Sequence, residues 1–100
     1  MAELRLTKQA QADLEDIRNS GIARFGTDAA ERHLKAIRQT FELLCRHPSA
    51  GQERPEFRGG LRSISRRPHT ILYSARDTDI LVVRVIHQAR DVATAFLGEQ

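Results

Sequence analysis

The stretch DILVVRVIHQARD, residues 79–91, decides the fold that we expect for this chain. Its first nine residues are rich in β-branched side chains and follow the turn-forming segment ARDTD at 75–79, a combination that is typical of a β-strand. Side chains alternate between the two faces of a strand, so Leu81, Val83 and Val85 are predicted to share one face. The other face carries Ile80, Val82, Arg84 and Ile86. A strand that is apolar on both faces is expected in the centre of a sheet.

Two more strands are predicted before this one, at residues 61–66 and 69–75. Arg67-Pro68 interrupts the first pair, because proline cannot donate a backbone hydrogen bond within a strand, and ARDTD supplies the second turn. Antiparallel hairpins are the simplest arrangement of the three strands. The preceding segment PSAGQERPEFRGG, residues 48–60, contains two prolines and three glycines and is predicted to be a loop.

The first part of the chain is predicted to form a strand and a helical hairpin. AELRL, residues 2–6, alternates like a strand, and Thr7 is a suitable N-cap for a helix that ends near Phe25. A second helix is expected to begin at Thr27 and to end before Pro48, since proline cannot continue it. Apolar or small residues recur at steps of three and four in both helices and form one seam. They are Ala10, Leu14, Ile17, Gly21, Leu34, Ile37, Phe41 and Leu44.

Together these elements predict a single two-layer α/β (α+β) domain over residues 1–100. The strand and the helical hairpin occupy residues 1–47, and the loop occupies 48–60. Residues 61–100 hold three antiparallel strands, which join the first strand in one sheet, and a short C-terminal helix.

The hairpin is expected to cover only one face of the sheet. The apolar row of Leu81, Val83 and Val85 should meet its seam. The opposite face then needs a cover from the terminal segment ARDVATAFL, residues 89–97, or from another chain. The acids of the first helix are expected on its solvated side, and they are Asp13, Glu15 and Asp16.

Composition excludes several classes of protein. At 100 residues, 40% of them hydrophobic, the chain has room for one modest core. No apolar run reaches the length of a bilayer span, and the N-terminal segment lacks the apolar stretch of a signal peptide, so a cytoplasmic protein is expected. The single Cys45 permits no internal disulfide and is expected to be buried. Neither a metal nor another cofactor is expected, because metal-ligand spacing is lacking among His33, His47, His69 and His87.

The net charge of +3 is unevenly distributed. The segment FRGGLRSISRRPHTILYSAR, residues 57–76, holds five arginines and no acid. Arginine has a planar, forked group that suits phosphate or carboxylate partners better than lysine does. The sequence therefore predicts a local basic surface that binds an anionic partner.

The order of these segments resembles the RelE/ParE superfamily of bacterial toxins, and most of all its ParE branch. The resemblance covers nearly the whole chain. It is carried by LTKQAQADLEDI (6–17), RFGTDAAERHLKAI (24–37), HPSAGQERPEFRGGLRSI (47–64), ILY (71–73) and ILVVRVIHQARD (80–91). The elements GLR, LY and IHQARD favour ParE. One departure is DIRNSGIARFG (16–26), where relatives often carry an aromatic residue soon after the Asp-Ile pair.

The resemblance implies two functions of different classes. ParE-like toxins bind and poison DNA gyrase, whereas RelE-like toxins cut mRNA in the ribosome. Cleavage by a 2′-hydroxyl requires a base, an acid and cations on the phosphate. Arg62 and Arg84 offer positive charge and His87 offers an acid, but a base is missing because Tyr73 is the single tyrosine and no lysine follows Lys35. Half of a nuclease site favours a binding protein, and the RelE-like nuclease stays the alternative.

The expected binding surface for the target or for an antitoxin joins basic and apolar residues. An antitoxin similar to ParD, with a flexible C-terminal segment that folds on its toxin, is the partner that the resemblance implies, with gyrase as the target. Direct binding to nucleic acid is not expected without that target. The predicted surface consists of Arg58, Arg62, Arg66, Arg67, Ile80, Val82, Arg84, Ile86, His87 and Arg90.

Overall fold

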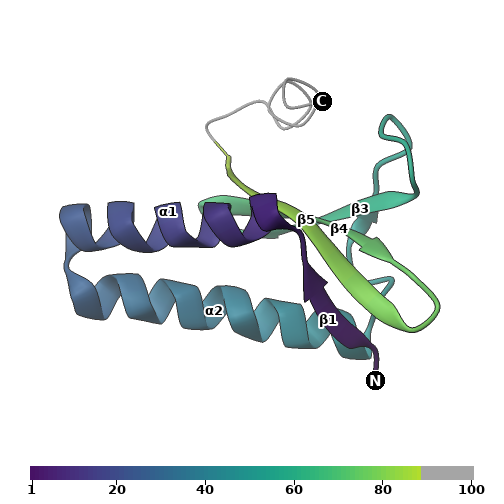
Figure 1. Ribbon diagram of the computed structural model, residues 1–100, viewed down its shortest axis with the longest axis horizontal. Coiled ribbons are helices and arrows are strands. Elements are labelled where there is room, and N and C mark those ends of the chain that lie inside the picture. Colours follow the sequence, from purple (N-terminus) through teal and green to yellow (C-terminus); the bar gives the residue numbers. More distant parts are fainter. Residues whose placement is uncertain (89–100) are drawn as a thin grey trace.

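A computed structural model describes residues 1–88 of the chain, in which two helices pack against one five-stranded sheet (Figure 1). The elements in chain order are β1 (Glu3–Leu6), α1 (Lys8–Phe25), α2 (Thr27–Arg46), β2 (Gln52–Glu53), β3 (Leu61–Arg66), β4 (His69–Ala75) and β5 (Asp79–His87). The strand order is β1-β5-β4-β3-β2, with β1 parallel to β5 and the other pairs antiparallel. The expected α+β class is therefore confirmed. The expected C-terminal helix at 89–97 lies outside the described residues.

The helical hairpin forms where the sequence predicts it, and α1 has a suitable cap at each end. The Thr7 hydroxyl accepts a hydrogen bond from the Ala10 backbone N–H at 3.0 Å, which satisfies a donor in the first turn of α1. The same hydroxyl donates to the Val83 carbonyl at 2.8 Å and so ties the start of α1 to β5. Gly26 ends α1 with φ of 88°, a left-handed conformation that glycine adopts without strain.

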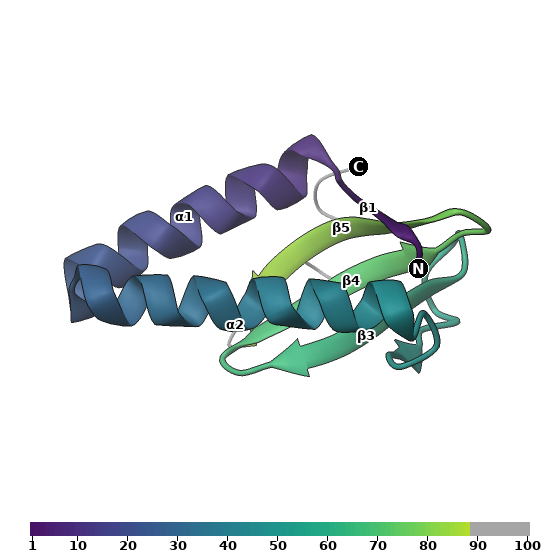
Figure 2. The same cartoon turned by 90° about the horizontal axis from the view of Figure 1, so that it is seen from below.

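The main core lies between the hairpin and the sheet (Figure 2). α2 contributes Ile37, Phe41 and Leu44, as the periodicity predicts, and Phe41 is only 2% exposed. Their partners on the strands include Ile71, Tyr73, Ile80, Val82 and Val85. Cys45 is buried in the same cluster, as expected. None of the helices in residues 1–88 is both long enough and apolar enough to cross a bilayer.

The predicted faces of the last strand are wrong because β5 contains a bulge. Tyr73 pairs with Val82 and Leu72 pairs with Arg84, which leaves Val83 without a partner between them. An extra residue of this kind reverses the alternation of side chains beyond it. Ile80 and Val82 therefore join Val85 in the helix-covered core, whereas Val83 packs with Phe57, Leu61 and Leu72.

The segment at 48–60 was predicted to be a loop throughout, but it also contains the short strand β2. Gln52 pairs with Ser63 and Glu53 pairs with Arg62, and the Arg54 backbone N–H donates to the Leu61 carbonyl at 2.9 Å. β2 thus extends the sheet at the edge of β3. A strand of two residues is too short to show a period in the sequence.

Candidate functional site

The structure does not bring the predicted binding residues together on one surface. Ile80 and Val82 have no exposed surface and Ile86 is 2% exposed, so the prediction of an exposed apolar face on β5 is wrong. Arg84 is also buried. Four others are exposed, namely Arg58, Arg66, Arg67 and His87. Their binding roles and that of half-buried Arg62 stay predictions, and Arg90 lies outside the described residues.

Arg84 is neutralised by Asp13, which the sequence had led us to place in solvent. The Arg84 Nε and Nη2 groups donate to the two carboxylate oxygens of Asp13 at 2.7 and 2.9 Å. One of these oxygens also accepts from the Val85 backbone N–H at 2.9 Å. The two side chains are 5% and 12% exposed. The pair connects α1 to β5 and satisfies the charge of Arg84 inside the fold.

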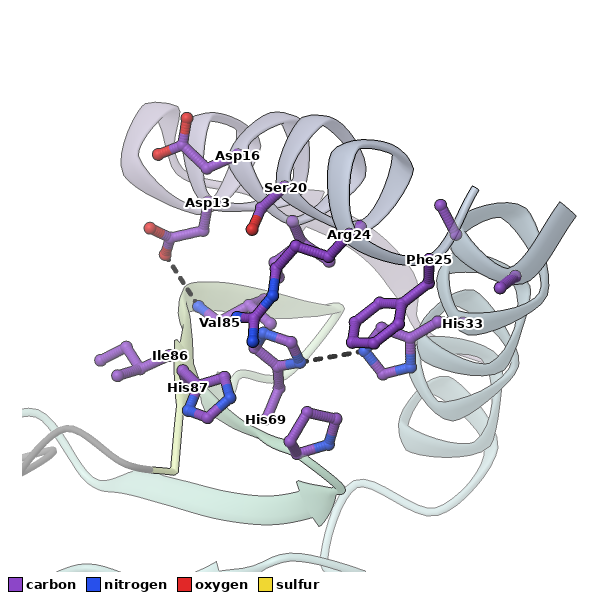
Figure 3. A pocket seen from close by; sticks show the side chains of 15 residues that line it. Asp13, Asp16, Ser20, Arg24, Phe25, His33, His69, Val85, Ile86 and His87 are labelled. Carbon is purple, nitrogen blue, oxygen red and sulfur yellow. Dashed lines mark hydrogen bonds between the residues drawn. The ribbon is translucent and has the colours of Figure 1, made fainter. Parts of the chain in front are cut away.

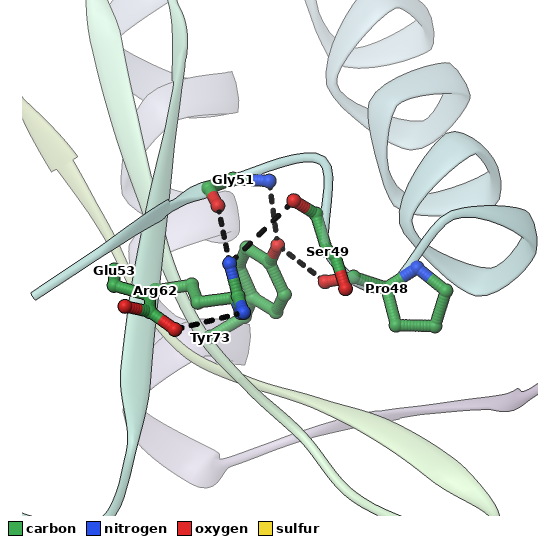
Figure 4. A network of polar contacts seen from close by, with 6 residues as sticks. All are labelled: Pro48, Ser49, Gly51, Glu53, Arg62 and Tyr73. Carbon is green, nitrogen blue, oxygen red and sulfur yellow. Dashed lines mark hydrogen bonds and ion pairs between the residues drawn. The ribbon is translucent and has the colours of Figure 1, made fainter.

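Arg62 takes part in a second network, which holds the segment before β2 against the sheet (Figure 4). The buried Tyr73 hydroxyl donates to the Pro48 carbonyl at 2.7 Å and accepts from the Gly51 backbone N–H at 2.8 Å. Arg62 donates to the Gly51 carbonyl at 2.9 Å and pairs with Glu53 at 3.2 Å. Burial raises the pKa of Tyr73, and the Gly51 N–H and the charge of Arg62 oppose the rise without reversing it. Tyr73 is therefore a poor proton acceptor near neutral pH.

The Tyr73 hydroxyl network is expected to contribute measurably to stability. Tyr73→Phe should lower the free energy of unfolding by about 1–3 kcal/mol, because a buried donor at Gly51 and a carbonyl at Pro48 lose their partner. Urea unfolding followed by circular dichroism measures the change. Thr40→Val is the matched control, because the Thr40 hydroxyl donates to the Ala36 carbonyl within α2 and that carbonyl keeps its helical hydrogen bond. Equal losses in the two variants would contradict this account.

A pocket of ≈ 410 Å³ lies between the hairpin and the sheet, at the start of β4 and the end of β5 (Figure 3). On the hairpin it is lined mostly by the half nearest the turn between α1 and α2, which we call the far half. Its apolar wall includes Ile17, Phe25, Ala30, Val85 and Ile86, and its polar residues include Asp13, Asp16, Ser20 and Arg24. The pocket is also lined by His33, His69 and His87, which we call the histidine cluster.

The histidine cluster was missed in the sequence, where its members are far apart. His33 Nε2 lies 2.9 Å from His69 Nδ1, and the ring centroids of His69 and His87 are 5.2 Å apart. Burial, aided by His33 and His87, lowers the pKa of His69 to about 4, although Asp13 acts in the opposite direction. Burial and the charge of Arg66 also lower the pKa of His33. Among residues 1–88, no group of three or more His, Cys, Asp or Glu could hold a metal ion.

The three residues of the nuclease alternative are separated by the register of the sheet. Arg62 pairs with Tyr73, whereas His87 pairs with His69 at the other end of β4. Four residues of strand place these positions about 13 Å apart. At this spacing one phosphate could contact both side chains only if both extended toward it, whereas Arg62 is held by Gly51 and Glu53 and Arg84 is paired with Asp13.

Comparison with known proteins identifies the family. The family model described as the ParE toxin of the type II toxin-antitoxin system parDE matches residues 4–92. The chain belongs to the ParE toxin family. Toxin ParE1 of Caulobacter vibrioides is 32% identical over 98 residues, covering 98% of this chain and all of that protein. Toxin ParE1 of Mycobacterium tuberculosis H37Rv is 36% identical over 88 residues, covering 87% of this chain and 90% of that protein.

The fold of this ParE family member is also similar to that of a solved structure. A chain of the chromosomal ParDE system from P. aeruginosa superposes with a TM-score of 0.73 at 24% identity, covering 87% of this chain and 96% of that one. The expected resemblance to the ParE branch is thus confirmed, and the chain is a ParE toxin of a type II toxin–antitoxin system.

Proposed function

We propose that this ParE toxin acts by binding and poisoning DNA gyrase rather than by cutting RNA. The proposal rests on one observation: the candidate catalytic groups already form contacts that stabilise the fold. Arg84 pairs with Asp13, Arg62 holds Gly51 and Glu53, and Tyr73 is buried with a raised pKa. A nuclease needs such groups free to converge on one phosphate.

The proposal also includes an acidic antitoxin similar to ParD. Its support is the exposure of three arginines, of which Arg58 precedes β3 and Arg66 and Arg67 lie at the far end of that strand. Within the segment 57–76 these arginines have no acidic residue beside them in the sequence. Negative charge on a partner would accelerate its association with these arginines.

The two functions are separated by a pair of assays on the purified toxin. With gyrase, ATP and supercoiled plasmid, we expect double-strand breaks that require gyrase and disappear when the cognate antitoxin is mixed in first. In a translating extract with a defined mRNA, we expect no codon-dependent cuts. Cuts that disappear in His87→Ala would overturn the proposal in favour of the ribosome-dependent nuclease.

The gyrase assay also tests whether the antitoxin binds at the exposed arginines. The charge-reversed double variant Arg66→Glu/Arg67→Glu should need several-fold more antitoxin for neutralisation than the wild type. Arg18→Glu/Arg46→Glu is the control for total charge, because both arginines are exposed and lie outside the basic segment. An equal antitoxin requirement in the two double variants would place the antitoxin elsewhere.

A further inference from the structure

The far half of the helical hairpin extends past the sheet. In Figures 1 and 2 the turn between α1 and α2 lies beyond the ends of the strands. The pocket is lined by this half of the hairpin on one side and by His69, Val85 and Ile86 of the strands on the other. Gly21 contacts Ala30 across the two helices, since a Cβ added to Gly21 would lie 3.2 Å from the Ala30 Cβ. The two helices of this half are therefore packed together and can unfold locally as one unit.

The histidine cluster connects this half of the hairpin to the sheet. His33 comes from α2 and His69 from the start of β4, and Figure 3 shows their rings joined across the pocket. Their hydrogen bond of 2.9 Å requires one ring nitrogen to donate and the other to accept. An imidazolium has N–H groups on both nitrogens, so the bond is lost when both rings are protonated.

The charges around the cluster act in both directions, because Asp13 favours a proton on His69 whereas His33 and His87 oppose it. Both α1 and β3 present charged groups, namely Asp13, Asp16 and Arg24 from α1 and Arg66 from β3. The carboxylate of Asp13 is already paired with Arg84 of β5. His69 is 8% exposed and has His33 on one side and His87 on the other. Protonation therefore places like charges side by side around the buried ring of His69.

We propose that the histidine cluster is a pH-sensitive switch that holds the far half of the hairpin on the sheet when neutral and releases it when the cluster is protonated. Release lets this half of the hairpin unfold locally, which breaks its backbone hydrogen bonds and changes the shape of the pocket between α1, α2, β4 and β5. The main core around Phe41 and Leu44 lies in the other half of α2 and stays closed. The switch is independent of the toxin's target.

The sign and size of the effect follow from linkage. In the closed form the pKa of His69 is about 4, against an ordinary value of 6.5. The open form, in which the ring is solvated, therefore binds more protons between these two pH values, and closure is fully favoured only above about pH 6.5. From His69 alone, the equilibrium constant for opening should rise about 30-fold between pH 7.5 and pH 5.0. His33 acts in the same direction, since its pKa is also lowered.

Native-state hydrogen exchange separates local release from unfolding of the whole domain. After correction for the intrinsic exchange rate, amides of residues 17–34 should exchange about 30-fold more readily at pH 5.0 than at pH 7.5. Their exchange should depend on urea much less than that of the core amides, because a local opening exposes less surface than unfolding of the whole domain. Amides of Ile71 and Leu72 should respond to urea as the whole domain does. If residues 17–34 show the same urea dependence as these core amides, the cluster only contributes to global stability and the proposal is overturned.

His69→Asn tests the titrating group itself, because the side-chain amide can replace Nδ1 in the hydrogen bond but does not titrate. The pH response of residues 17–34 should fall from about 30-fold to a few-fold. His47→Gln is the control, since His47 is exposed at the end of α2, and it should keep the full response. A full response in His69→Asn would overturn the proposal. If that variant does not fold, NMR titration of the wild type decides, because a His69 ring that titrates near pH 6.5 would overturn it equally.

Discussion

Asp13→Ala is expected to lower the free energy of unfolding by about 3–5 kcal/mol. The change leaves the guanidinium of Arg84 buried without its carboxylate and removes the acceptor of the Val85 N–H. Both costs are large in a buried site, because neither group can reach water without moving β5 away from α1. Urea unfolding at neutral pH measures the loss, and the midpoint of the transition should fall without a change in its slope.

Two control variants isolate the ion pair. Asp16→Ala removes an exposed carboxylate one turn further along α1 and should change stability by less than about 0.5 kcal/mol. The double variant Asp13→Leu/Arg84→Met replaces both charges with apolar groups and should recover most of the loss. If Asp13→Ala and Asp16→Ala behave alike, Asp13 is solvated as its helical position had indicated, and the buried pair does not stabilise the fold.

Phe41→Ala is expected to destabilise the domain by about 3–5 kcal/mol. Phe41 lies in the core with Leu44, Ile71 and Tyr73, so its removal loses apolar contacts and leaves a cavity. The total free energy of unfolding of a domain of this size is only about 5–15 kcal/mol. Reduced solubility and a thermal transition lowered by roughly 15 °C or more should follow.

Leu43→Ala is the matched control for Phe41→Ala, because Leu43 is 40% exposed on the opposite side of α2. Its expected cost is below about 1 kcal/mol. A cooperative transition shifted by only a degree or two in Phe41→Ala would show that the side chain is not packed in the core.

Local patterns in the sequence predict most of the fold. The steps of three and four define both helices, and Pro68 and the ARDTD turn divide the strands at the observed residues. The β5 bulge was missed because almost every side chain from 80 to 86 is apolar, so the pattern looks the same with or without an extra residue. Strand β2 was missed because it depends on its partner β3 and not on its own two residues.

The candidate site was harder to predict because its contacts are long-range. Asp13 and Arg84 are 71 residues apart, and His33 and His69 are 36 apart. A helical face alone places Asp13 in solvent, and only the position of β5 reveals its partner. The histidines lack the spacing of metal ligands in the sequence, yet the fold gathers three of the four.

The parallel pairing of β1 with β5 delays completion of the fold during synthesis. Among the strands in residues 1–88, β1 is made first and β5 last, and the Thr7 to Val83 hydrogen bond spans 76 residues. At roughly 5–20 residues per second, β1 waits on the order of 4–15 s for its partner strand. The nascent toxin therefore lacks its complete sheet until β5 has been made, so a partner that recognises the finished surface can bind only after that point.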